Sequence, residues 1–204
     1  MNTLKDKVIL ISGGTAGIGQ ACAQAYVKAG ALVAFIGLDQ ESVLATGTLL
    51  GTPHLGICGD VSLEGDIKAA VDQTIATFGR LDAIHNNAGL ASPSKPLHET
   101  TEEEWGRLFD VNVKSILLTT KYGFPHLKAT KGCILNTSSL VGEIGQENHA
   151  AYAATKGAVN ALTKSMAIDY AALGIRVNSV MPAAVMTPML QQWALEQEQP
   201  QRVF

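Results

Sequence analysis

Short apolar runs alternate with longer segments of helix-forming residues along almost the whole chain. The first run, Val8 to Ile11, leads through a glycine-rich turn into a predicted helix from Ile18 to Ala29, which Gly30 ends. Later apolar runs predict five more strands: Leu32 to Ile36, His54 to Cys58, Leu81 to Asn86, Cys133 to Thr137 and Arg176 to Met181. The segments between them predict four helices: Ser42 to Leu50, Leu63 to Phe78, Thr101 to Lys121 and Ala151 to Leu173. This alternation is typical of a doubly wound parallel sheet in a three-layer α/β/α domain, here a single domain over residues 1–204.

The turn after the first strand has the sequence Gly13-Gly14-Thr15-Ala16-Gly17-Ile18-Gly19. Glycines permit tight backbone geometry and close approach of a ligand, and the free N–H groups at a helix start suit a pyrophosphate. The spacing differs from Gly-x-Gly-x-x-Gly, and an ordinary loop is the alternative. The strand, turn and helix context favours a dinucleotide site.

Tyr152 and Lys156 stand four residues apart in an Ala-rich helical segment, so their side chains leave the same helical face. A phenol with a pKa of about 10 is a poor base at neutral pH, and a fixed ammonium nearby favours the phenolate. The pair suits proton transfer to or from an oxygen. Tyr-x-x-x-Lys also occurs by chance on helices, so this interpretation depends on the other motifs.

Composition agrees with one globular α/β domain and narrows the partners. The chain has 204 residues, 47% of them hydrophobic and 16% charged, with a formal charge of -3. Dispersed Lys and Arg argue against a nucleic-acid or anionic-membrane partner, and no apolar run approaches the roughly 18 residues of a membrane span. We expect a cytoplasmic protein. Cys22, Cys58 and Cys133 are scattered, which predicts buried small residues and no metal site.

An ordered series of motifs resembles that of the short-chain dehydrogenase/reductase family over nearly the whole chain. After the glycine turn come Gly59-Asp60-Val61, Asn86-Asn87-Ala88-Gly89, Asn112, Ser138-Ser139, Tyr152 with Lys156, and Pro182 with Thr187. Each motif is weak alone, whereas the series is specific. The resemblance implies a Rossmann fold and hydride transfer between a nicotinamide cofactor and a secondary alcohol or ketone.

The resemblance also implies a role for each matched residue. Tyr152 is the implied general acid/base, and Lys156 holds the nicotinamide ribose and lowers the Tyr152 pKa. Ser139 bonds the substrate oxygen, and Asn112 supports a water relay, although an Asn inside a helix can also be tolerated polarity. The implied cofactor-binding residues are Gly13, Gly14, Thr15, Gly17, Ile18, Gly19, Leu38, Asp39, Asp60, Val61, Asn87, Ala88, Gly89, Tyr152, Lys156, Pro182, Val185 and Thr187.

Two of these interpretations have alternatives in the residues themselves. Asp60 can serve as a helix cap before Ser62 instead of an adenine ligand, and the two roles are compatible. Ser139 beside Tyr152 suggests an acyl-enzyme hydrolase, but no His or acid is placed by motif to activate the serine, and Gly-x-Ser-x-Gly is absent from the sequence.

Three departures from the family pattern bear on function. Gly37 stands where NAD-preferring members carry Asp, but Leu38 replaces the Arg of NADP-preferring members and Asp39 would repel a 2′-phosphate, so NAD is favoured and NADP is not excluded. Ala183 replaces a Gly, which would be strained at positive φ. The sequence ends before the family's last strand, with Leu190 to Glu198 as a candidate part of a substrate lid.

The early end supports a second hypothesis, a catalytically impaired, truncated dinucleotide-binding relative that acts as a binding or assembly module, and it is equally compatible with a fragment of a longer, active protein. Family analogy implies a homodimer or homotetramer through the helices that hold Asn112 and Tyr152. Val159, Leu162 and Met166 are candidate contact residues, and they are equally able to face the sheet.

Overall fold

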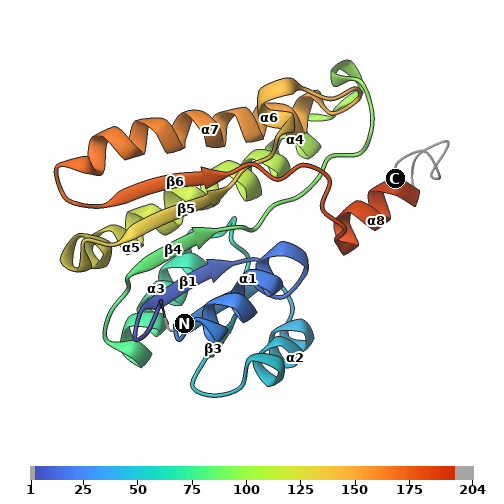
Figure 1. The fold of residues 1–204 in the computed structure, drawn as a ribbon. Helices are drawn as coiled ribbons and strands as arrows, with labels where there is room; N and C mark the ends of the chain where they lie inside the picture. The colour runs from blue at the N-terminus through green and yellow to red at the C-terminus, as the bar shows by residue number, and fades with distance from the viewer. Residues whose placement is uncertain (1–2, 196–204) are drawn as a thin grey trace.

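The computed structural model describes residues 3–195 and confirms the predicted doubly wound sheet. Six parallel strands lie in the order β3-β2-β1-β4-β5-β6 (Figure 1). Their bounds are β1 Val8–Ser12, β2 Leu32–Gly37, β3 Leu55–Cys58, β4 Ala83–Asn86, β5 Cys133–Thr137 and β6 Arg176–Val180. The strand order reverses between β1 and β4, which is the point where open α/β sheets bind ligands.

The helices also follow the predicted order, with one correction. They are α1 Gly17–Lys28, α2 Gln40–Leu50, α3 Glu64–Phe78, α4 Glu102–Phe109, α5 Ser115–Thr130, α6 Val141–Ile144, α7 Ala150–Ala171 and α8 Pro188–Leu195, with a 3-10 turn η1 at Leu97–Glu99. The helix predicted as continuous over Thr101 to Lys121 is instead interrupted by a π-helical turn, η2 Asp110–Lys114, and then continues to Thr130. The predicted capping box is present, since Thr101 and Glu104 bond each other's backbone N–H groups.

Apolar side chains form one core on each face of the sheet. On one face, Leu10 and Ile84 pack with Ile67 of α3 and Val159 of α7. On the other, α1 and α2 cover β1, β2 and β3, where Phe35 is fully buried. Alternation along buried parallel strands supplies both cores, as expected for a sheet sandwiched between helices.

The structure decides between the two alternatives for α7 and corrects an expectation about the cysteines. Val159 and Met166 are buried against the sheet, which is the second alternative, so they offer no surface to a partner. The expected burial is wrong for Cys58, which is exposed because it ends β3, the outermost strand on its side of the sheet, while Cys22 and Cys133 are half-buried. Between residues 3 and 195, no helix is both long and apolar enough to cross a membrane.

Candidate active site

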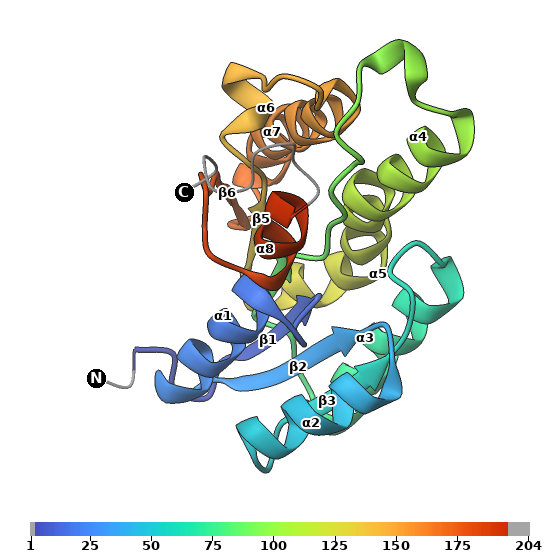
Figure 2. The ribbon, with the colours of Figure 1, turned by 90° about the vertical axis from the view of Figure 1, so that its right-hand side faces the viewer.

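A cavity of about 1050 Å³ opens at the carboxyl ends of the strands, beyond β1 and β4, between which the strand order reverses. Its walls come from the turn after β1, the loops after β2, β3, β4, β5 and β6, and helices α7 and α8. Helix α8 lies beyond these strand ends (Figures 1 and 2). The cavity is at the upper end of the range for ligand pockets, so it suits a large ligand. Most sequence-predicted site residues line it; Gly14, Gly19, Asp39 and Asn112 do not.

The glycine turn forms one end of the cavity. Gly13 has φ +63°, and a Cβ there would lie 2.8 Å from Ala88 Cα, so only glycine fits. Gly14 and Gly19 are needed for internal packing instead: added Cβ atoms would strike Phe35 and the Gly13 carbonyl. The turn therefore leaves its backbone open toward the cavity at the start of α1, as an anion-binding cradle requires.

Side-chain packing at the end of β2 explains why position 37 is a glycine. A Cβ at this position would lie 2.8 Å from Val43 Cγ2 and would overlap the Thr15 side chain. Thr15 thus occupies the space of the missing side chain. Asp39 is the N-cap of α2, where its carboxylate accepts hydrogen bonds from the Ser42 N–H at 2.8 Å and the Ser42 hydroxyl at 2.6 Å. These hydrogen bonds hold the pKa of Asp39 below its usual value.

Asp60 lines the cavity and also closes the turn before α3. Its carboxylate accepts hydrogen bonds from the N–H and hydroxyl of Ser62 and from Arg107, whose Nη2 is 3.1 Å away. Partial burial acts to raise the pKa of Asp60, but these donors lower it overall. The helix-cap role expected for Asp60 is wrong, because the N-cap residue of α3 is Leu63 and Asp60 instead bonds Ser62 in the turn before the helix; the adenine role stays a prediction. No motif in the sequence points to Arg107, because it lies 47 residues from Asp60 in the chain and the two meet only when α4 packs in the folded protein.

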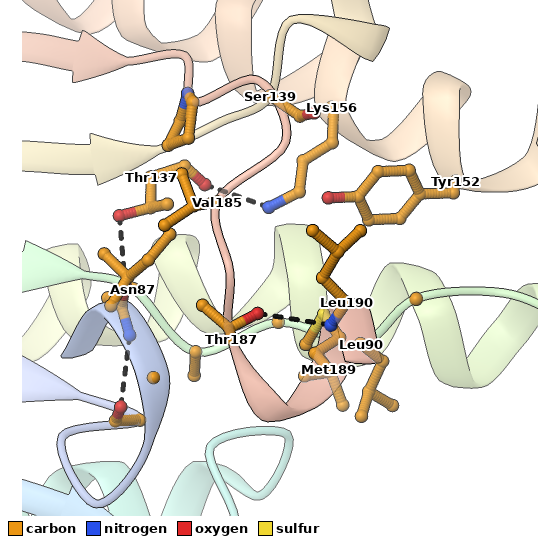
Figure 3. Close-up of a pocket in the computed structure, with 18 of the residues that line it drawn as sticks. Asn87, Leu90, Thr137, Ser139, Tyr152, Lys156, Val185, Thr187, Met189 and Leu190 are labelled. Carbon is orange, nitrogen blue, oxygen red and sulfur yellow. Dashed lines mark hydrogen bonds between the residues drawn. The ribbon is translucent and has the colours of Figure 1, made fainter. Parts of the chain in front are cut away.

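Tyr152 and Lys156 of α7 line the cavity together with Ser139, at the end away from the glycine turn, and the Lys156 nitrogen points toward the Tyr152 hydroxyl (Figure 3). Lys156 is 4% exposed, its Nζ lies 5.6 Å from the Tyr152 ring centroid, and it donates a hydrogen bond to the Thr137 carbonyl at 2.9 Å. Burial lowers the pKa of Lys156 to about 8. The same helix thus presents a phenol and a buried amine to one space, as the four-residue spacing predicts.

The expected lowering of the Tyr152 pKa is absent from this geometry. Burial raises the pKa of Tyr152, and hydrogen bonding with Ser139 opposes that rise without reversing it. Removing the phenol from water disfavours its charged form, and this effect exceeds that of the Ser139 hydrogen bond. The prediction is therefore wrong for the protein without ligands.

Asn112 is 2% exposed and belongs to the π-helical turn η2. Its side-chain oxygen accepts from Leu90 N–H at 2.7 Å, and its amide donates to the Leu90 carbonyl and to the Thr155 hydroxyl, each at 3.0 Å. Asn112 therefore joins the loop after β4 to α7, and it is not merely tolerated polarity. Gly89 faces both Asn112 Oδ1 and Lys156 Nζ, at 3.3 and 3.5 Å from an added Cβ, so a larger residue would crowd the space between them.

A polar network that the sequence does not reveal lies beneath the nicotinamide end predicted for the cavity. His85 Nδ1 is 3.0 Å from the Tyr26 hydroxyl and His85 Nε2 is 2.9 Å from the Thr137 hydroxyl. Thr137 in turn donates to Asn87 Oδ1 at 3.3 Å, and Asn87 donates to the Gly13 carbonyl at 3.1 Å (Figure 3). Burial lowers the pKa of His85 to about 4. The network fixes the Asn87 amide against the glycine turn.

The loop after β6 and α8 form the last wall. Thr187 begins this helix, since its hydroxyl accepts from Leu190 N–H at 3.2 Å (Figure 3). Trp193 Nε1 donates to the Ser94 hydroxyl at 2.7 Å and so links α8 to the loop after β4. The described part of the predicted lid lies here; its residues 196–198 are outside the described residues. Ala183 does not have positive φ, so the strain expected at positive φ does not arise there.

Comparison with known proteins matches this chain to dehydrogenases and reductases, in sequence and in structure. The family model "short chain dehydrogenase" matches residues 7–198. L-fucose dehydrogenase of Rattus norvegicus is 40% identical over 195 residues, which cover 95% of this chain and 72% of that protein. Cyclopentanol dehydrogenase of Comamonas testosteroni is 41% identical over 197 residues, with 94% and 78% covered. The crystal structure of 3-ketoacyl-(acyl-carrier-protein) reductase from Brucella melitensis complexed with NADH gives a TM-score of 0.90 at 34% identity, with 92% and 79% covered.

Proposed function

The chain belongs to the short-chain dehydrogenase family, and from this membership we propose that it oxidises a secondary alcohol, or reduces the matching ketone, with Tyr152 as general acid/base and NAD as the preferred cofactor. One observation carries the proposal. Tyr152, Lys156 and Ser139 line the inner end of a cavity whose other end is the glycine turn of α1. A dinucleotide whose pyrophosphate is held by that turn could therefore reach the Tyr152 phenol with its nicotinamide end.

The residues of the cavity fit a dinucleotide. Gly13 and Gly17, both at positive φ, leave the backbone of the turn open for a pyrophosphate. Asp60 would bind the adenine, and Lys156 would hold the nicotinamide ribose, with Val185 and Thr187 near the carboxamide. When bound, the nicotinamide supplies the hydride chemistry, accepting a hydride from the carbinol carbon or returning it.

The protein residues supply the proton transfer. In reduction, the raised pKa of Tyr152 keeps the phenol protonated at neutral pH, so that it can donate its proton to the developing alkoxide. Ser139 would donate a second hydrogen bond to the same oxygen. In oxidation, the phenolate accepts the hydroxyl proton as the hydride leaves, so no covalent intermediate forms. Asn112 supporting a water relay to Lys156 belongs to this proposal.

Charge at the outer end of the cavity supports NAD over NADP. Among the described lining residues, Arg107 and Lys156 are the cations, and Arg107 is paired with Asp60. Leu38 is exposed and offers no charge, while Asp39 follows it in the chain as the N-cap residue of α2. A 2′-phosphate would meet an anion without a free cation nearby. The Brucella melitensis reductase, of similar structure, is complexed with NADH.

Self-association belongs to the proposal as a dimer or tetramer. Because Val159 and Met166 are in the core, contact would have to use the exposed apolar residues Leu117 of α5 and Ile168 of α7. Sedimentation of the purified protein tests this, and replacement of both residues by Ser should shift an oligomer toward monomer.

The first experiment is a parallel fluorescence titration with NADH and NADPH, followed by oxidation assays with cyclopentanol and L-fucose. NADH should bind more tightly, and Lys156→Ala should weaken binding and lower kcat/KM by at least about 10²-fold. A well-folded protein that bound neither nucleotide would refute the proposal and would favour a fragment of a longer protein or an assembly module. Tighter binding of NADPH would refute the cofactor preference alone.

A further inference from the structure

His149 is a buried histidine on the cavity wall that the proposed chemistry does not use. It is the N-cap residue of α7, three residues before Tyr152, and only 6% of its surface is exposed. Its backbone carbonyl accepts the Ala153 N–H at 2.8 Å. The preceding residue is also tied down, since the Asn148 carbonyl accepts the Lys95 N–H at 3.0 Å. His149 therefore has a fixed position relative to Tyr152.

Hydrogen bonding decides which ring nitrogen of His149 carries the hydrogen. Nδ1 lies 2.9 Å from the Glu147 carbonyl oxygen, which can only accept, so Nδ1 is the donor. In the neutral ring, Nε2 then holds a lone pair. Within residues 3–195, His149 Nε2 has no hydrogen-bond partner, and the atom is accessible to solvent. The cavity wall thus presents an accessible, unsatisfied acceptor.

The surroundings of His149 are mainly apolar. Its ring packs edge-on against Trp193 of α8, with centroids 5.5 Å apart, and against Tyr152, with centroids 6.5 Å apart. Leu90, Met189 and Leu190 line the same part of the cavity, together with Ser139 and the exposed Gln146. The charged residues that line the cavity within the described part of the chain are Asp60, Arg107 and Lys156. None of them forms a hydrogen bond or ion pair with His149.

We propose that His149 Nε2 accepts a hydrogen bond from a second hydroxyl of the substrate, and that the substrate class is therefore a diol with an otherwise apolar carbon skeleton. This rests on the proposed function. The hydroxyl proton of the first carbinol passes to the Tyr152 phenolate, and the hydride on the carbinol carbon reduces the nicotinamide. The hydroxyl held by His149 is unchanged, so the product is a hydroxyketone. A sugar would place further hydroxyls against the apolar walls, where they lose their hydrogen bonds to water.

Substrate pairs and matched variants test this assignment. The full chain and its His149→Phe and His149→Ala variants are assayed with cyclohexanol and with the 1,2-, 1,3- and 1,4-cyclohexanediols. We expect at least one diol to exceed cyclohexanol in kcat/KM by about tenfold, mainly through KM, and this ratio to approach unity in both variants. His149→Phe keeps a ring against Trp193, so it separates loss of the acceptor from loss of packing. Nucleotide titration verifies that each variant is folded.

Two results would overturn the inference. One is a wild-type protein whose kcat/KM for cyclohexanol equals its kcat/KM for every diol. The other is a His149 variant that lowers kcat/KM equally for all the alcohols, which indicates a packing role. Calorimetric binding of the same alcohols in the presence of NADH decides the matter without turnover. A diol advantage in binding that depends on His149 supports the inference even if no alcohol is oxidised, whereas absent turnover with intact nucleotide binding counts against the proposed dehydrogenase activity.

Discussion

Substitution of Gly37 tests whether Thr15 occupies the space of the missing side chain. A Cβ at position 37 would lie 2.8 Å from Val43 Cγ2 and closer still to Thr15 Cγ2. Overpacking of this kind costs about 1–3 kcal/mol, so Gly37→Ala should lower the free energy of unfolding by that amount. Thr15→Ala removes the methyl and hydroxyl that block the site. The cost of Gly37→Ala should then fall by about 1 kcal/mol, with the remainder due to Val43.

Urea unfolding followed by circular dichroism measures all four proteins of this double-mutant cycle. Gly37→Asp in the two backgrounds extends the cycle to function: with Thr15 replaced, the carboxylate gains room and should strengthen NADH binding relative to NADPH. Equal costs of Gly37→Ala in both backgrounds, with a coupling free energy below about 0.5 kcal/mol, would refute the steric explanation.

Three further predictions concern pH and the cavity wall. The pKa of His85 falls from 6.5 to about 4 on folding, so the unfolded chain binds the proton first and stability should fall by about 3 kcal/mol as pH drops from 6.5 to 4. His85→Val should flatten this slope in acid unfolding curves, and an unchanged slope would contradict the assignment. Because the pKa of Tyr152 is raised, alcohol oxidation should accelerate about tenfold per pH unit near neutrality, and Tyr152→Phe should be inactive at every pH; a rate independent of pH counts against the phenol as base. Trp193→Phe loses the hydrogen bond to Ser94, so alcohol KM should rise about tenfold with the affinity for NADH unchanged, and an unaltered KM would refute a role of this link in closing the cavity.

Local sequence was sufficient for most of the architecture. Each of the six predicted strands differs from the observed one by no more than about two residues. For β1 and β2 the reason is that a buried parallel strand needs an uninterrupted apolar run, which is visible in a short window. Gly13 was also predictable, since its positive φ is a requirement of one residue and its immediate turn. The spacing of Tyr152 and Lys156 on one helical face is similarly a local property.

Long-range contacts explain where sequence reasoning failed. The π-helical turn interrupts the helix after α4 where Asn112 bonds Leu90 and Thr155, and these partners are 22 and 43 residues away. The orientation of Val159 toward the sheet follows from the packing of α7, which an Ala-rich sequence with little amphipathic contrast does not indicate. Burial of Tyr152 likewise depends on neighbouring elements, so the direction of its pKa shift was wrong.

The sequence by itself determined the order of strands and helices, the glycine turn and the four-residue spacing of Tyr152 and Lys156, because each depends on residues close together in the chain. The order of the motifs along the chain also identified the family. The tertiary structure alone decided which groups meet at the cavity: Arg107 beside Asp60, His85 beneath Thr137, and His149 between Tyr152 and Trp193. A hydrogen bond or a desolvated ring depends on distances of a few ångströms between elements, and those distances exist only once the sheet and its helices have packed together.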